Sequence, residues 1–117
     1  MSDAKWSFTR VGKFWQPHRE PKADENTLLA VETLIIPFGN REDSVRNGLR
    51  TWREDSRRYG VGYVVTTASA SIKKISEEEM EIGDMYGQFE DARLPVDEFE
   101  KMLESFADAL AEYHAKK

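Results

Sequence analysis

The chain has 117 residues, of which 39% are hydrophobic and 33% charged, and its formal net charge is −5. This length supports one compact domain with a core, so the sequence predicts a single domain over residues 1–117. The chain has no cysteine, which excludes a disulfide framework, a thiolate zinc site and a cysteine nucleophile. No apolar run approaches the roughly 20 residues that a membrane-spanning helix needs, and the polar N-terminal segment is unlike a signal peptide. We therefore expect a cytoplasmic protein that has no membrane partner.

Charge is distributed unevenly along the chain. Residues 1–60 carry eleven Lys and Arg against nine Asp and Glu, whereas residues 61–117 carry six against thirteen. The basic half either faces the acidic half within one fold or faces a separate acidic partner. The sequence leaves both arrangements open.

The first elements are expected to be strands. Apolar and polar side chains alternate after Lys5, which predicts a strand over residues 5–16 with a bulge or turn at Gly12. Residues 17–26 contain two prolines and predict an exposed loop. The apolar run over residues 27–36 predicts a second strand, which ends at Pro37.

A long helix is expected next. Asn40 is a candidate N-cap, Glu42 and Asp43 fall in the first turn where negative charge is favoured, and Gly60 marks the end. One side of this helix carries the residues that we expect to be buried, namely Val45, Leu49, Trp52 and Tyr59.

The second half of the chain predicts strands followed by a helix. Residues 61–68 have the composition of a strand that could continue to Ile75. Residues 76–89 fit a strand or a helix, and we favour a strand because Gly83 and Gly87 weaken a helix. Residues 97–114 predict an amphipathic helix with a long apolar stripe: Phe99, Met102, Leu103, Phe106, Leu110 and Tyr113.

Together these elements predict an α+β fold. Its expected order is β-β-α-β-β-β-α, with a mainly antiparallel sheet and two helices in a single layer on one face. The sequence shows no internal repeat and no low-complexity tract.

The strongest candidate for a functional surface is a row of arginines on the first predicted helix. It consists of Arg46, Arg50, Arg53 and Arg57. Their spacing of four, three and four places them within roughly a 60° stripe. Guanidinium groups suit carboxylates and phosphates, so the row is a candidate partner-binding surface. The alternative is a solvated helix face whose charge is paired locally by Glu42 and Glu54, or by the acidic half of the chain.

The N-terminal aromatic residues are a second candidate. Large aromatic side chains usually belong to the core, but they also stack on unpaired bases in proteins that bind single strands. Phe14 and Trp15 are adjacent, so one of them points away from the core of a strand. The outward side chain is a candidate contact residue, and we assign this role to Trp15.

No catalytic, metal or cofactor site is predicted. His18 and His114 lack a partner at metal-ligand spacing, and no phosphate-binding loop or nucleophile motif is present. The sequence therefore favours a non-enzymatic protein-binding module, such as an inhibitor, an immunity-type protein, an adaptor or an accessory subunit. Its basic helix face and acidic C-terminal half would meet complementary surfaces, with an acidic protein as the expected partner. The alternatives are a single-stranded nucleic-acid-binding protein that uses sheet aromatics and the arginine helix, and a homodimeric subunit.

Overall fold

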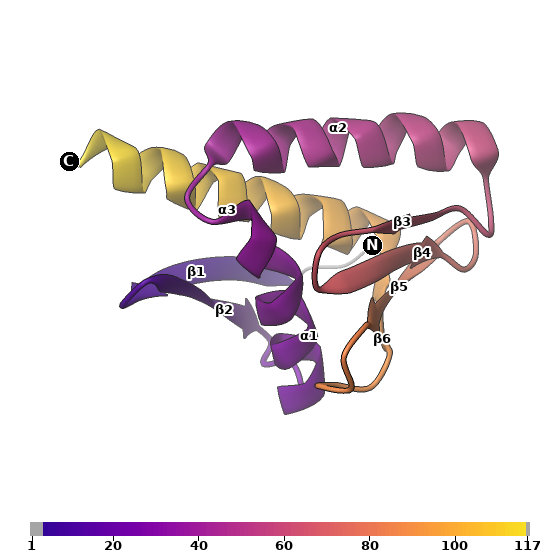
Figure 1. Ribbon diagram of the computed structural model, residues 1–117, viewed down its shortest axis with the longest axis horizontal. Helices are drawn as coiled ribbons and strands as arrows, with labels where there is room; N and C mark the ends of the chain where they lie inside the picture. The colour runs from indigo at the N-terminus through magenta and orange to yellow at the C-terminus, as the bar shows by residue number, and fades with distance from the viewer. Residues whose placement is uncertain (1–3, 117) are drawn as a thin grey trace.

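A β-hairpin opens the fold, in the computed structural model that describes residues 4–116 (Figure 1). Strand β1 (Lys5–Val11) ends at a turn in which Gly12 has a φ of 62°, a conformation that glycine adopts readily. Strand β2 (Phe14–Glu20) returns antiparallel to β1 along its whole length. The single strand predicted over residues 5–16 is therefore two strands, and β2 occupies the start of the predicted loop.

Residues 27–36 form a helix, and the prediction of a strand there was wrong. Helix α1 (Glu25–Ile35) begins at Asp24, whose carboxylate accepts a 2.8 Å hydrogen bond from the Thr27 N–H. An apolar run suits a buried strand and a buried helix equally well, and here the Asp24 N-cap favours the helix. Four apolar residues with helical spacing reach the core: Ala30, Val31, Leu34 and Ile35. The short 3₁₀ turn η1 (Ile36–Phe38) follows.

The long helix predicted after residue 40 is confirmed as α2, but its N-cap residue differs from the predicted one. Helix α2 (Glu42–Tyr59) is followed by the predicted Gly60 at its C-cap, which has a φ of 75°. Arg41, not Asn40, occupies the N-cap position, and no side chain caps the helix there. The Asn40 side-chain oxygen Oδ1 instead accepts hydrogen bonds from the Arg10 guanidinium and from Trp15 Nε1.

A four-stranded antiparallel sheet forms most of the second half. Its strands are β3 (Val64–Thr66), β4 (Ala70–Lys74), β5 (Glu79–Asp84) and β6 (Ala92–Pro95), in the order β3-β4-β5-β6. The strand favoured over residues 76–89 is confirmed for its central part, β5, whereas residues 76–78 and 85–89 are bends. Ser76 Oγ accepts hydrogen bonds from the N–H groups of Glu78 and Glu79, which makes a turn before β5 in place of a helix cap.

Helix α3 (Val96–Ala115) is the centre of the packing. In Figure 1 it runs between α2 on one side and the β1–β2 hairpin on the other. The fold is α+β as predicted, but the described chain has three α-helices and two sheets where two helices and one sheet were expected. Because α2 packs against α3, the helices pack on one another as well as on the sheets, where the sequence predicted a single helical layer.

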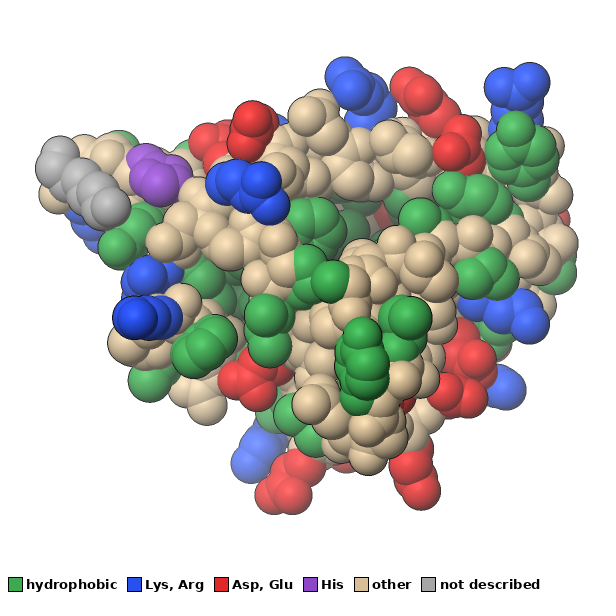
Figure 2. All heavy atoms as spheres, viewed as in Figure 1, with side chains coloured by type: hydrophobic (Ala, Val, Ile, Leu, Met, Phe, Trp, Pro, Cys, Tyr) green, Lys and Arg blue, Asp and Glu red, His purple; other side chains and the backbone are tan. Residues whose placement is uncertain are grey.

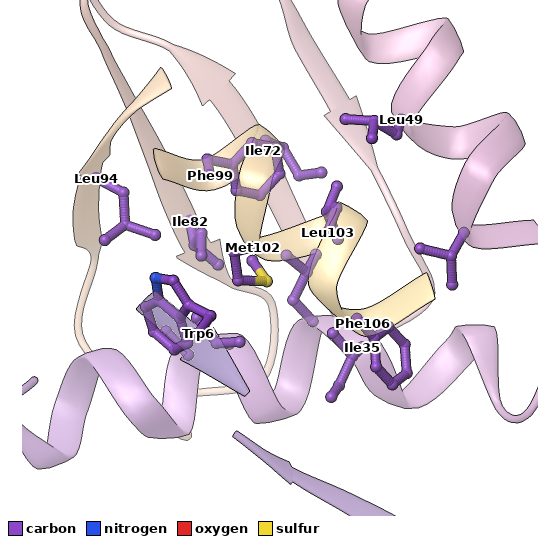
Figure 3. Packing of buried hydrophobic residues seen from close by; sticks show 14 of the residues in the cluster. Trp6, Ile35, Leu49, Ile72, Ile82, Leu94, Phe99, Met102, Leu103 and Phe106 are labelled. Carbon is purple, nitrogen blue, oxygen red and sulfur yellow. The ribbon is translucent and has the colours of Figure 1, made fainter. Parts of the chain in front are cut away.

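One hydrophobic cluster joins these elements. Figure 3 shows Met102, Leu103 and Phe106 of α3 facing apolar side chains of the hairpin, α1 and the sheet. Phe106 is fully buried, and its ring centroid lies 5.0 Å from that of Phe8. The apolar stripe predicted for the final helix is therefore buried from Phe99 to Leu110.

Candidate functional site

The predicted arginine row lies on one side of α2, and two of its members pair with acidic residues. Arg46 Nε donates to Glu42 Oε2 at 2.6 Å, and its Nη2 donates to Asp108 Oδ1 of α3 at 3.0 Å. These hydrogen bonds raise the pKa of Arg46, with the Glu42 bond as the larger cause. The Arg46 side chain is 45% exposed, so water screens this pairing.

Arg53 is held more firmly against α3. Its Nη2 donates to Glu104, and its Nε donates to Glu100 Oε1 at 2.9 Å. The hydrogen bond with Glu104, followed by that with Glu100, raises the pKa of Arg53 above its ordinary value. The acidic C-terminal half thus neutralises part of the basic helix face, which was one of the two arrangements that the charge distribution left open.

Arg50 and Arg57 are exposed, and neither has an ion pair with a described residue. Helix geometry explains the division. Measured around the helix from the centre of the buried stripe, Arg53 lies at about 70°, Arg46 at about 90°, Arg57 at about 110° and Arg50 at about 130°. Helix α3 reaches the two arginines nearest the core and leaves the outer two in solvent.

The C-terminal end of α2 brings exposed cationic and apolar residues together. Tyr59 is 61% exposed, Val61 is 54% exposed, and Val64 on β3 is 47% exposed. Arg58 is exposed beside Tyr59, with its guanidinium carbon 5.5 Å from the centroid of the Tyr59 ring, and exposed Arg57 lies one residue earlier on α2. We call these five residues the corner patch. Figure 2 shows basic and hydrophobic side chains side by side at this end of α2.

Two further features shape the corner patch. Tyr59 was predicted to be buried, but it is exposed because it is the last residue of α2. Its ring stacks on that of Tyr63, with 5.9 Å between the ring centroids and an interplanar angle of 16°. Strand β3 lies at the edge of its sheet, and among residues 4–116 no strand pairs with its outer side. The patch is therefore next to backbone groups that can accept another strand.

Trp15 is in the core, so the contact role predicted for it does not fit its position. It is 8% exposed, and its ring packs edge-on against Phe106 and Tyr113. The hairpin register explains this, because Trp15 pairs across the strands with Arg10 and shares the face that buries Trp6.

Phe14 is the outward member of the pair at 58% exposure. Together with exposed Val11 and Ile36 it lines a shallow groove of about 390 Å³ at the hairpin tip. The sequence predicted that one residue of this pair is exposed, but it assigned the contact role to Trp15, whereas Phe14 is the exposed one.

The remaining chemistry of the described residues is sparse. His18 Nε2 lies 2.8 Å from Thr9 Oγ1, and His114 Nε2 lies 2.6 Å from the backbone carbonyl oxygen of Asn40. Among residues 4–116 no group of His, Asp and Glu side chains has the arrangement of a metal site. No helix in the same range is both long and apolar enough to cross a bilayer.

Comparison with known proteins identifies no relative. The chain matches no protein-family model, no curated protein and no solved structure at a significant level. The candidate site therefore rests on the geometry alone.

Proposed function

We propose that the protein is a small non-enzymatic protein-binding module, and that the corner patch docks an acidic surface of its partner. The exposure of Tyr59 beside Arg58, whose guanidinium carbon lies 5.5 Å from the centroid of the Tyr59 ring, carries this proposal. Tyrosine and arginine are among the residue types that contribute most to binding at protein interfaces, and here both are exposed at the end of a helix.

The proposal narrows the role expected for the arginine row. Arg46 and Arg53 already neutralise acidic residues of α3, so a partner gains little from approaching them. Arg50 lies two helical turns before Arg57 on the same outer edge and extends the positive charge away from the corner patch. We expect Arg50 and Arg57 to steer association, and Tyr59 to supply apolar contact.

The neighbouring edge strand suggests the form of the partner segment. An extended acidic segment can add to the outer side of β3 while its carboxylates reach Arg57 and Arg58. Val64, exposed on β3, would then contact an apolar side chain of that segment. A second copy of this chain and a different protein are both compatible with this chemistry, and an acidic protein remains the expected partner. The absence of cysteine fits the expected cytoplasmic location.

Single-stranded nucleic acid is the less favoured alternative. Base stacking needs exposed aromatic rings on a sheet. Three of the hairpin's four aromatic residues, Trp6, Phe8 and Trp15, are each less than 9% exposed and pack in the core. This leaves only Phe14 for stacking on the hairpin, which favours a protein partner.

Site-specific crosslinking tests the proposal. Replacing Tyr59 with p-benzoylphenylalanine in the native host should yield a crosslinked protein upon irradiation, which mass spectrometry identifies. Adding Arg57→Glu and Arg58→Glu should remove this adduct, whereas Lys13→Glu with Lys101→Glu, which makes the same change in net charge elsewhere, should not. The proposal is refuted if no protein adduct forms at position 59, or if both charge-reversed pairs behave alike while the thermal midpoints are unchanged.

A further inference from the structure

The tip of the β1–β2 hairpin carries exposed apolar side chains. Val11 and Phe14 lie opposite each other across the two strands and are 57% and 58% exposed. Ile36, the first residue of η1, is 49% exposed and lines the same groove of about 390 Å³, which we call the tip groove. In Figure 1 the hairpin tip projects at one end of the molecule, and Figure 2 shows hydrophobic and basic side chains together there. An apolar surface that projects in this way favours contact with another molecule.

Glu32 is the charged member of the lining of the tip groove. It lies on α1 one turn before Ile36 and is half-buried. Its carboxylate has no hydrogen bond or ion pair with another residue between 4 and 116. An apolar occupant would displace water from this carboxylate, which is costly unless the occupant also brings a cation. The tip groove therefore favours a partner with a positive charge beside an apolar side chain.

The hairpin tip itself has this chemistry. Lys13 lies between Val11 and Phe14 in a two-residue turn with Gly12, whose φ is 62°. Lys13 is exposed, and its ammonium group has no ion pair with a described residue. Because the tight turn holds Lys13 directly beside Phe14, a second copy of this chain can bring an aromatic ring and a cation to the tip groove together.

The tip and the groove also suit a symmetric arrangement. Val11 and Phe14 line the groove and belong to the tip, so both parts form one continuous surface. In a dimer with a twofold axis the same surface meets itself, and every contact between two different residues occurs twice. Lys13 and Glu32 have opposite charges and fulfil this condition, which makes the surface complementary to itself.

We propose that two copies of this chain form a symmetric dimer at the tip groove. Phe14 of each copy packs against Val11 and Ile36 of the other, and Lys13 of each copy pairs with Glu32 of the other. The apolar surface is small beside the roughly 800 Å² that each partner buries in a standard interface, so the dimer dissociates in the micromolar range or above. The tip groove and the corner patch lie at opposite ends of the molecule, so this dimer does not depend on the protein-binding function proposed above (Figure 1).

Sedimentation velocity of the full chain tests the dimer. Between about 10 µM and about 1 mM, the wild-type chain should change from monomer to dimer in a saturable way. Phe14→Ser should weaken dimerisation at least tenfold, because it removes the aromatic contact from both halves of the interface. Tyr86→Ser is a matched control, since Tyr86 is an aromatic residue outside the tip groove that is 69% exposed, and it should leave dimerisation unchanged.

A charge exchange identifies the pairing. Lys13→Glu and Glu32→Lys should each weaken dimerisation at least tenfold, because like charges then meet across the interface. An equimolar mixture of the two variants should dimerise as well as the wild type, since each variant supplies the charge that the other lacks. A pairing of Lys13 with Glu32 of the same chain would give no such rescue.

A third variant separates this dimer from association through the corner patch. Arg57→Glu combined with Arg58→Glu should leave dimerisation unchanged. Circular dichroism checks that every variant is folded, which is expected because the substituted side chains are exposed or half-buried. The proposal is overturned if the wild-type chain is monomeric at about 1 mM, if the mixture of folded charge variants stays monomeric, or if the corner-patch variant abolishes dimerisation and Phe14→Ser does not.

Discussion

A buried carboxylate on α3 should be essential for holding the N-terminal hairpin in place. Glu98 is 2% exposed, and its Oε2 accepts hydrogen bonds from Trp6 Nε1 and Arg19 Nε, both at 2.8 Å. Its Oε1 accepts a third bond from Arg19 Nη2 at 3.2 Å. The paired hydrogen bonds with Glu98 raise the pKa of Arg19. One side chain thus connects both strands of the hairpin to α3.

Replacing Glu98 with alanine leaves a guanidinium and an indole N–H without their acceptor. Breaking a buried ion pair by removing one partner costs about 3–5 kcal/mol. The Arg19 side chain is 21% exposed, so water can partly solvate it and the lower half of this range is expected. At about 4 °C for each kcal/mol, the melting temperature should fall by roughly 12–16 °C.

Urea denaturation followed by circular dichroism measures this loss. Glu112→Ala is a matched control, because Glu112 is an exposed carboxylate of the same helix that pairs with exposed Lys116, and it should cost less than about 0.5 kcal/mol. A double-mutant cycle with Arg19→Ala should give a coupling of at least about 1 kcal/mol, since the two residues share one network. The reasoning is refuted if Glu98→Ala costs no more than Glu112→Ala, or if the two substitutions at the network are additive.

Three further outcomes are expected. Phe106→Ala should cost about 3–5 kcal/mol of unfolding free energy, since the ring is fully buried, and a loss below about 1 kcal/mol would show that the site collapses freely. Arg53→Ala should cost about 0.5–1 kcal/mol and Arg57→Ala less than about 0.5 kcal/mol, because only Arg53 pairs with α3; equal losses would contradict the division of the row. Burial alone would raise the pKa of Asp84, but hydrogen bonds from backbone N–H groups, Tyr86 among them, outweigh it and lower the pKa. Because the folded pKa lies below the unfolded one, the stabilisation is present above about pH 4 and is lost as the pH falls through the folded value. The protection of the Tyr86 amide, its exchange rate relative to the intrinsic rate, should then fall in acid, and Asp84→Asn should make this protection independent of pH; a wild-type amide whose protection does not change with pH would contradict this.

Elements with strong periodicity were predictable from the sequence. The stripes that contain Trp52 and Phe106 identified α2 and α3 because their spacing of three and four persists over several turns. The segment 27–36 was not predictable from its apolar pattern, since only the hydrogen bond that Asp24 accepts distinguishes a helix start from a loop. The hairpin was not predicted because the sequence did not show that Gly12 and Lys13 form a complete turn between two strands. That turn fixes the face of every residue in β2.

The candidate surface was predictable only in part. The arginine row follows from spacing alone, whereas the pairing of Arg46 and Arg53 depends on the side at which α3 docks, which no local pattern records. Tyr59 has the spacing of a buried residue, and its exposure results from its place at the end of α2. The corner patch could therefore be identified only from the tertiary structure.

The connection between the hairpin and α3 has a consequence during synthesis of the chain. Trp6 leaves the ribosome 92 residues before Glu98, an interval of roughly 5–20 s at typical elongation rates. An isolated two-stranded hairpin is at best marginally stable in water, so β1 and β2 must keep Trp6 and Phe8 accessible during that interval. The nascent chain should therefore present an aromatic segment to chaperones until α3 emerges, and its hairpin should become resistant to protease only after that point.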